Sequence, residues 1–317
     1  MKRILVTGAA GQIGSELIVA LRQRYGSGNV IACGHRTVPN SEILDSGPFE
    51  SFDVRDSSAV TAVVVQYDVD TIYHLAGILS ATGETRPQRA WDININGLCN
   101  VLEAARQHGC AVFFPSSIAS FGLSTPQDNT PQETIQRPQS IYGITKVAGE
   151  LLCDYYHHRF GVDSRGLRFP GLISHETPPG GGTTDYAVEI FYAALTEKKY
   201  TCFLRKGTRL DMMYMPDAIR AAIAVMEANP GRLSIRNAFN VTAMSFAPED
   251  LCAEIQKSIP DFIMDYKVDP VRQAIADSWP NNMDDSVARE QWGWQPEYDL
   301  PSMTRDMLDK LSRKLKA

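Results

Sequence analysis

Several features that mark other classes of protein are missing from this chain of 317 residues. It has no uninterrupted apolar run near the roughly 20 residues that cross a bilayer. Its formal net charge of -6 lacks the basic excess with which proteins bind nucleic acid backbones. The short basic start at Lys2 and Arg3 leads straight into glycines, without the small-residue cleavage site of a signal peptide. We therefore expect neither a membrane nor a nucleic acid as partner, and we predict a cytoplasmic protein.

The patterns of disulfide and metal sites are missing as well. The six cysteines are scattered without CxxC spacing, and the six histidines form no HExxH motif. Such spacing is typical of reduced, mostly buried thiols rather than of disulfides or a zinc centre. We predict no metal site and expect free thiols at Cys33, Cys99, Cys110, Cys153, Cys202 and Cys252.

What is present is a regular alternation of short apolar runs and amphipathic segments. The first run, residues 3–7, is continuous and ends at a glycine, as a buried strand does. The segment 12–24 then places Ile13, Leu17 and Leu21 at helical spacing. The same pattern predicts strands at 30–33, 51–54, 71–75, 111–116 and 164–169, and helices at 57–66, 86–108 and 142–160. Strands that alternate with helices predict an α/β fold with a Rossmann-type, doubly wound parallel sheet.

The rhythm changes after Pro170. A Pro/Gly-rich loop at 178–184 is followed by predicted helices near 185–197, 216–228, 248–257 and 284–292, with short strands between them. We predict a first domain at 1–172, and a smaller C-terminal α/β cap at 173–317 that binds the substrate. Later segments can still return to the main sheet.

Three glycines stand between the first predicted strand and the first predicted helix. Gly8, Gly11 and Gly14 have the spacing GxxGxxG. In dinucleotide sites, small residues here let the backbone approach the pyrophosphate, and the helix N-terminus offers free N–H groups. A tight turn without a ligand is the alternative, but the strand and the helix stand in the right order. We predict a dinucleotide-binding turn that includes Gln12 and Ile13.

The acid that normally ends the second strand and holds the adenosine ribose is absent. Cys33 is followed instead by Gly34, His35 and Arg36. Arg36 is either a solvated loop charge or a ligand for a ribose 2′-phosphate. These residues therefore leave NAD and NADP both open.

Other strand ends complete the predicted cofactor site. Asp53 is a candidate adenine contact, although a solvated loop acid or a helix cap explains it equally well. Small residues after the fourth predicted strand permit close backbone approach. We keep Asn94 and Asn96, on the following helix, as structural. The predicted cofactor-binding residues at the strand ends are Asp53, Val54, Leu75, Ala76, Gly77 and Pro170.

Tyr142 and Lys146 lie four residues apart at the start of a long predicted helix. That spacing stacks both side chains on one face, a turn apart. Free tyrosine, with a pKa of about 10, is a poor base, but a neighbouring ammonium and a positive nicotinamide ring favour the phenolate. Tyrosine can then take a hydroxyl proton as hydride leaves the same carbon. The same spacing also arises by chance on helix surfaces.

A third polar group is expected to orient the substrate oxygen. Ser116 and Ser117 end the fifth predicted strand, beside the place where Tyr142 must lie. Strand alternation points one of the two toward the site, and leaves open which one.

These residues resemble the extended short-chain dehydrogenase/reductases over nearly the whole chain. Longer strings in both halves resemble more specifically the L-threonine 3-dehydrogenases of the epimerase-like type, at 168–174, 179–187, 212–217, 277–280 and 284–286. That family oxidises threonine at C3 with NAD+ and gives 2-amino-3-ketobutyrate. The departure is Gly34, where the family usually has an acid; NADP is therefore not excluded.

The resemblance implies roles for single residues. Tyr142 becomes the base and Lys146 its partner, and Ser117 is selected over Ser116 because it holds the motif position. Hydroxyls of the 178–184 loop suit the carboxylate of a small amino acid, and its glycines, Gly180 to Gly182, suit closure over the ligand. The implied substrate-binding residues are Ser80, Ser117, Tyr142, Thr183, Thr184 and Trp279.

The resemblance also implies a homodimer, in which the helices at 86–108 and 142–160 pair into a four-helix bundle. Two other interpretations stay open. One is an NAD-dependent sugar-nucleotide epimerase or dehydratase, whose site needs room and cations for a nucleotide diphosphate. The other is a catalytically silent dinucleotide-binding module, against which the intact Tyr/Lys/Ser set argues.

Overall fold

The computed structural model describes residues 1–180 and 182–316; Gly181 of the predicted glycine loop lies outside the described residues. Its centre is a seven-stranded sheet with the order β10-β6-β5-β4-β1-β2-β3, and every neighbouring pair is parallel. The predicted doubly wound α/β fold is thus confirmed. The strands are β1 (Ile4–Thr7), β2 (Val30–Gly34), β3 (Phe49–Ser51), β4 (Thr71–His74), β5 (Ala111–Ser117), β6 (Ser164–Phe169) and β10 (Phe239–Asn240).

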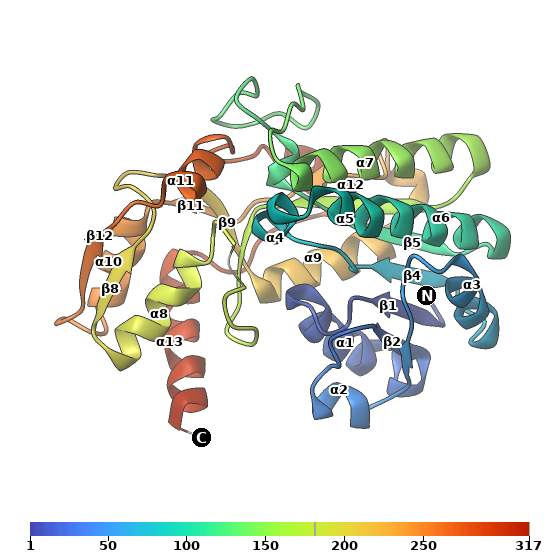
Figure 1. The fold of residues 1–317 in the computed structure, drawn as a ribbon, viewed down its shortest axis with the longest axis horizontal. Helices are drawn as coiled ribbons and strands as arrows, with labels where there is room; N and C mark the ends of the chain where they lie inside the picture. Colours follow the sequence, from blue (N-terminus) through green and yellow to red (C-terminus); the bar gives the residue numbers. More distant parts are fainter. Residues whose placement is uncertain (181, 317) are drawn as a thin grey trace.

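The sheet is buried on both faces. In β1, Ile4 and Val6 join one apolar cluster and Leu5 joins the other. Burial on both faces explains why the strands are continuous apolar runs rather than alternating ones. Figure 1 shows α6 and α7 above the sheet and α1 and α2 below it. One face is covered by α1 (Gln12–Tyr25), α2 (Ser41–Asp45), α9 (Met215–Glu227) and α12 (Ser286–Trp292), the other by α3 (Ser57–Gln66), α6 (Gly97–His108) and α7 (Ile141–Phe160).

Most of the second half forms a smaller group of elements beside the sheet (Figure 1), around a third apolar cluster. One small sheet joins β7 (Gly171–Ile173), β9 (Leu210–Tyr214) and β11 (Met244–Phe246), and another joins β8 (Lys199–Cys202) to β12 (Ile263–Tyr266). The helices here are α8 (Tyr186–Thr196), α10 (Pro248–Gln256), α11 (Pro270–Asp277) and α13 (Leu300–Lys316). Since α9, α12 and β10 lie on the main sheet, the division at residue 172 stays a prediction.

Several predicted elements differ from the observed ones. The predicted strand 51–54 lies earlier, at Phe49–Ser51, so Asp53 and Val54 follow the strand instead of ending it. The predicted helix 86–108 is divided by a π-helical turn, η2 (Asp92–Asn96). Sequence reasoning missed α13, although Met303, Met307 and Leu311 give it an apolar stripe. The shorter elements are η1 (Ser27–Asn29), α4 (Ser80–Thr85), α5 (Pro87–Trp91), η3 (Ile118–Ser120) and η4 (Pro230–Arg232).

The cysteines are free, as predicted, and all except the half-buried Cys99 are buried. In the described part of the chain, no group of three or more His, Cys, Asp or Glu side chains is placed to hold a metal ion. No helix within residues 1–180 and 182–316 is both long and apolar enough to cross a membrane.

A buried ion pair fastens α7 to the sheet. Glu150 accepts two bonds from Arg168 on β6, at 3.1 and 2.8 Å, and both side chains are less than a tenth exposed. Ser116 of β5 also donates to Glu150, and Gln136 donates to it at 2.8 Å. A buried charge pair with its remaining hydrogen bonds satisfied tolerates few other arrangements. The pair therefore fixes the position of α7 on β5 and β6.

We expect Glu150→Ala to lower the free energy of unfolding by about 3–5 kcal/mol, because it leaves Arg168 buried without its partner. Chemical denaturation of the full chain measures this. Glu103→Ala is the matched control: it breaks the exposed pair with Arg106 on α6 and should cost less than about 1 kcal/mol. Equal losses in the two variants would show that the buried pair has no special part in stability.

Candidate active site

Two adjoining cavities lie where the sheet strands end. One lies around Tyr142 and Lys146 and the other around Arg36 and Asp53, and we name them the catalytic cavity and the adenosine cavity. Gly8, Gly11 and residues 75–78 line both, so the two form one continuous groove. Every predicted site residue lines it. Arg36, Asp53 and Val54 line the adenosine cavity; the catalytic cavity is lined by Gly8, Gly11, Gln12, Ile13, Gly14, Leu75, Ala76, Gly77, Ser80, Ser117, Tyr142, Lys146, Pro170, Thr183, Thr184 and Trp279.

The glycine turn between β1 and α1 requires glycine at two positions. Gly8 has a φ of +74°, and a Cβ there would lie 2.7 Å from the backbone nitrogen of Ala76. A Cβ on Gly14 would overlap the carbonyl oxygen of Gly8. The first turn of α1 carries no acidic residue, and Gly11 has no side chain to cap it. Its free N–H groups therefore face the groove as a site for a phosphate, which fits the pyrophosphate of a dinucleotide.

Tyr142 and Lys146 lie in the first turns of α7, which the Ser140 hydroxyl caps by accepting from Gly143 N–H at 3.1 Å. Lys146 Nζ donates to the Pro115 carbonyl at 2.5 Å and lies 5.2 Å from the centre of the Tyr142 ring. Both side chains are half-buried. The predicted stacking of the pair on one helix face is therefore what the structure shows.

Burial moves the pKa values of this pair in opposite directions. It raises the pKa of Tyr142 to about 12, against a smaller lowering by the hydrogen bond with Ser117. It lowers the pKa of Lys146 to about 8, against the opposing effects of Glu150 and Cys153. The protein alone therefore holds Tyr142 as a neutral phenol at neutral pH, and further positive charge in the cleft is needed for it to act as a base.

The two serines at the end of β5 point to different surroundings. Ser116 is buried and donates to Glu150, beneath the helix. Ser117 is half-buried, lines the catalytic cavity and interacts with the Tyr142 side chain. Strand alternation thus leaves Ser117, the residue selected by the resemblance, next to the phenol.

Residues from three segments, two of which contribute hydroxyl groups, line the part of the catalytic cavity that we call its far end. Ser80 begins α4, Thr183 and Thr184 precede α8, and Trp279 follows α11. Ser80, Thr183 and Trp279 are each less than a tenth exposed. The hydroxyls of Ser80, Thr183 and Thr184 are small donors without a formal charge, and they are suited to the carboxylate of a small zwitterionic ligand.

Sequence reasoning missed Asp185 in the cavity wall. Asp185 accepts from the Gly182 backbone N–H at 2.7 Å and lines the cavity beside Thr184. The signal was its place directly after the two threonines, ahead of the predicted helix. A carboxylate among hydroxyls is suited to an ammonium group.

The polar pair His74 and Thr7, at the ends of β4 and β1, was also missed. The His74 Nδ1 atom lies 3.0 Å from the Thr7 hydroxyl, which also accepts from Ala76 N–H at 3.3 Å. Burial, with a smaller effect of Lys146, lowers the pKa of His74 to about 3, so the ring stays neutral. It supports the backbone at residue 76, where the two cavities join.

Asn94, predicted to be structural, belongs to the π-helical turn. Its side chain bonds both backbone groups of Ile78, at 2.7 and 3.1 Å, and donates to Thr145 on α7 at 3.0 Å. It thereby joins the segment after β4 to the helix that carries Tyr142. Asn96 bonds Asp92 at 2.8 Å on the exposed side of its own turn.

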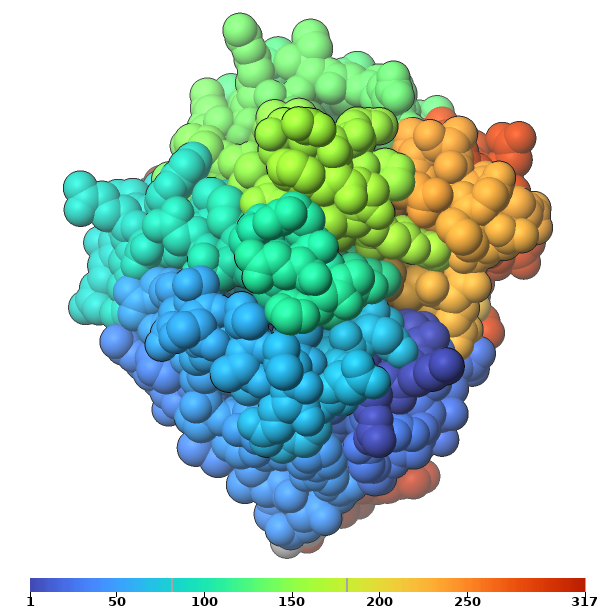
Figure 2. Space-filling model, turned by 90° about the vertical axis from the view of Figure 1, so that its right-hand side faces the viewer, coloured from blue at the N-terminus to red at the C-terminus, as the bar shows by residue number. Residues whose placement is uncertain are grey.

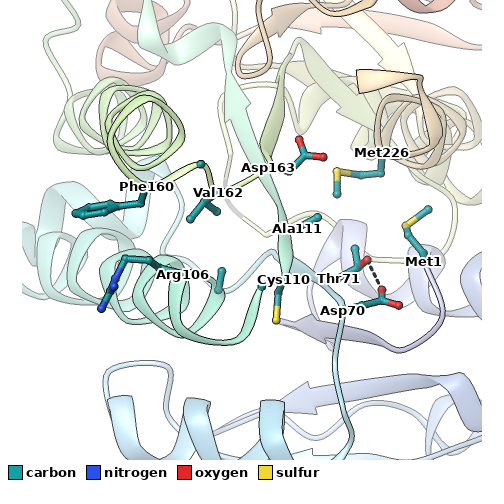
Figure 3. Close-up of a pocket in the computed structure, with 13 residues that line it drawn as sticks. Met1, Asp70, Thr71, Arg106, Cys110, Ala111, Phe160, Val162, Asp163 and Met226 are labelled. Atoms are coloured by element: carbon teal, nitrogen blue, oxygen red, sulfur yellow. Dashed lines mark hydrogen bonds between the residues drawn. The ribbon is translucent and has the colours of Figure 1, made fainter. Parts of the chain in front are cut away.

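A third cavity lies at the opposite end of the sheet, where the strands begin. Figure 2 looks onto this face, with the N-terminus in dark blue, and Figure 3 shows Asp70 bonded to Thr71 in the cavity. Its other acid, Asp163, is paired with Arg165 and Arg236. None of the predicted site residues lines it. Ligands of open parallel sheets bind at the carboxyl ends of the strands, so the groove is the stronger candidate.

Comparison with known proteins agrees with this geometry. The model of the NAD dependent epimerase/dehydratase family matches residues 4–241. A Staphylococcus haemolyticus protein described as an uncharacterized epimerase/dehydratase is 54% identical over 314 residues, 99% of each chain. The solved L-threonine dehydrogenase of Clostridium difficile is 56% identical with a TM-score of 0.98, over 99% of this chain and 98% of that one. A monomeric L-threonine 3-dehydrogenase from a metagenome is 45% identical with a TM-score of 0.94, over 98% and 99%. The predicted resemblance is confirmed.

We expect Gly8→Ala to weaken NADH binding at least about tenfold, because the left-handed conformation alone costs a side chain roughly 1–2 kcal/mol. Fluorescence titration with NADH measures the affinity. Gly28→Ala is the control, since its added Cβ has no atom within 4 Å. Unchanged NADH affinity in Gly8→Ala would remove the glycine turn from the cofactor site.

Proposed function

The chain belongs to the NAD-dependent epimerase/dehydratase family, and we propose that it oxidises L-threonine at C3 to 2-amino-3-ketobutyrate. NAD is its cofactor. The proposal draws on the similarity to L-threonine dehydrogenase structures along nearly the full chain. The observation that carries it is the convergence of Tyr142, Lys146 and Ser117 with the hydroxyls of Thr183 and Thr184 on one cavity.

Three side chains take part in removing the proton of the C3 hydroxyl, and each has a different role. Tyr142 accepts the proton of the C3 hydroxyl, and Ser117 bonds the same oxygen and fixes its direction. Lys146, fixed by the Pro115 carbonyl, keeps a positive charge one turn from the phenol and favours the phenolate. Bound NAD+, held by the groove at the ends of the strands, would supply the acceptor for the C3 hydrogen and its electron pair, and also the additional positive charge. The hydroxyl becomes a carbonyl, and the proton stays on Tyr142.

The far end of the cavity recognises the amino acid. The hydroxyls of Ser80, Thr183 and Thr184 donate to the carboxylate, and Asp185 receives the ammonium group. Trp279 forms an apolar wall against the small side chain, and its burial keeps water from this end. Among the described residues that line the catalytic cavity, Lys146 is the only lysine or arginine, and it already donates to the Pro115 carbonyl, so a nucleotide diphosphate would find few cations there.

We expect Tyr142→Phe to keep the NADH affinity of the parent and to lower turnover with L-threonine by about 10²–10⁴, because only the proton acceptor is removed. NADH formation with L-threonine and NAD+ measures turnover. Tyr155→Phe, on the same helix but 54% exposed, is the control and should remain active. An active Tyr142→Phe would overturn the assigned base; a parent that binds NADH yet ignores L-threonine would overturn the substrate.

We also propose that the chain forms a homodimer through α7 and α6. Ile144, Leu151 and Tyr155 form a stripe along α7 at helical spacing, and they are 42%, 63% and 54% exposed. An apolar stripe on a helix that already packs on a sheet is suited to a second copy of the same helix.

The expected mass in sedimentation equilibrium at micromolar concentration is therefore that of a dimer. Leu151→Glu should give a monomer, since it places a charge within the stripe. The control is Leu123→Glu, which changes a leucine of similar exposure outside α6 and α7 and should leave the dimer intact. A monomeric parent would place this chain with the monomeric metagenome enzyme.

A further inference from the structure

The adenosine cavity departs from a typical NAD site at the end of β2. In dinucleotide folds, an acid at this position bonds the ribose hydroxyls, whereas an arginine nearby accommodates a 2′-phosphate. Here β2 ends at Gly34, and His35, Arg36 and Thr37 follow it along the cavity wall. The wall therefore offers cations where an NAD site usually offers a carboxylate.

The backbone at this turn is built around glycine. A Cβ on Gly34 would lie 2.8 Å from the Thr37 carbonyl oxygen and 3.3 Å from the Phe49 ring. The first distance is shorter than carbon and oxygen atoms tolerate without a shift of the backbone. An aspartate at residue 34 would thus displace the turn that positions His35 and Arg36.

The one acid in the cavity wall is already neutralised by a cation. Asp53 accepts from Arg55 Nε at 3.1 Å and from Arg55 Nη2 at 2.6 Å, and His35 Nδ1 lies 3.6 Å away. Arg55 lowers the pKa of Asp53 to about 2, so the carboxylate stays ionised and paired. Arg55 also bonds Asp92 at 2.8 Å, which holds it in place. Asp53 is therefore a poor substitute for the missing ribose acid.

Arg36, unlike Asp53, has no partner among the described residues. Its side chain is exposed at the cavity, and it makes no hydrogen bond or ion pair with any residue that the structure describes. Arg89, from α5, lines the same cavity and is likewise unpaired among residues 1–180 and 182–316. A guanidinium binds a phosphate through two parallel hydrogen bonds, so both are well suited to a doubly charged monoester.

We propose that the adenosine cavity is a subsite for a ribose 2′-phosphate, with Arg36 as its principal ligand, so that the chain binds NADP+ more tightly than NAD+. The proposal rests on the dinucleotide site of the proposed function, but it is independent of the substrate. NAD remains a cofactor, because the rest of the groove contacts parts that the two dinucleotides share. The added 2′-phosphate would meet the unpaired guanidinium groups of Arg36 and Arg89. The carboxylate in the cavity wall, Asp53, is already paired with Arg55 and would repel the phosphate less than a free carboxylate.

The test is binding of two adenosine fragments, which needs no turnover. Calorimetry compares adenosine 2′,5′-bisphosphate with 5′-AMP, and the bisphosphate should bind about tenfold or more tightly, a preference that falls as salt increases. Arg36→Ala should abolish the preference and leave the 5′-AMP affinity unchanged, whereas Arg36→Lys should keep part of it. Arg305→Ala, an exposed arginine on α13 outside both cavities, is the control and should behave as the parent.

Equal affinity of the parent for the two fragments, or a preference that survives Arg36→Ala, would overturn the proposal. Failure to bind either fragment would remove the dinucleotide site itself. A clear preference for the bisphosphate in a protein that does not oxidise L-threonine would keep this proposal and reject the proposed reaction. The two can therefore fail separately.

Discussion

The position of α7 on the sheet is the constraint on which the candidate site depends. Tyr142, Lys146 and Glu150 occupy successive turns of one helix face, and each is tied to something other than its own helix. Glu150 bonds Arg168 and Ser116 beneath the site, and Lys146 bonds the Pro115 carbonyl. A one-residue shift of the helix would leave two buried charges unpaired, which is costly. The position of the phenol thus depends on a charge pair two turns away, whose residues are not among those that line the two cavities.

The same burial that fixes these groups also sets their charge states. Burial raises the pKa of Tyr142 and lowers the pKa of His74, so both stay neutral at neutral pH, whereas Lys146, with a pKa lowered to about 8, still carries its positive charge. In a medium of low polarity, one additional positive charge has a larger effect on a neighbouring phenol than it would have in water. The cleft therefore keeps Tyr142 as a neutral phenol, whose deprotonation a cationic group in the cleft would favour.

The sequence was sufficient to predict six of the seven strands of the main sheet, with β3 misplaced by a few residues, most of the helices that cover it, and the residues that line the groove at its carboxyl edge. Apolar runs and glycine positions are local signals, and parallel strands necessarily bring their ends together. What it could not give was pairing between distant residues. Glu150 and Arg168 were ordinary charges in the sequence, and only the fold shows that they are buried together. His74 was missed for the same reason, whereas Asp185 did have a local signal in its place directly after Thr183 and Thr184. The choice between Ser116 and Ser117 needed the resemblance, because strand alternation shows that the two side chains point to opposite faces of the sheet but not which of them faces the site.

The edge strand β10 has a consequence for how the chain reaches this structure. Its two residues pair with Leu167 and Arg168 of β6, about seventy positions earlier in the chain, and α9 must cross the sheet face before they arrive. Contacts of such separation form late, because the intervening chain loses its freedom before any stabilising contact is gained. During synthesis, the apolar face that receives α9 is therefore exposed while more than fifty further residues are added. Exposed apolar surface of this kind makes a partly folded chain prone to aggregation, and α12 packs against β10 only after a further stretch of chain has been added.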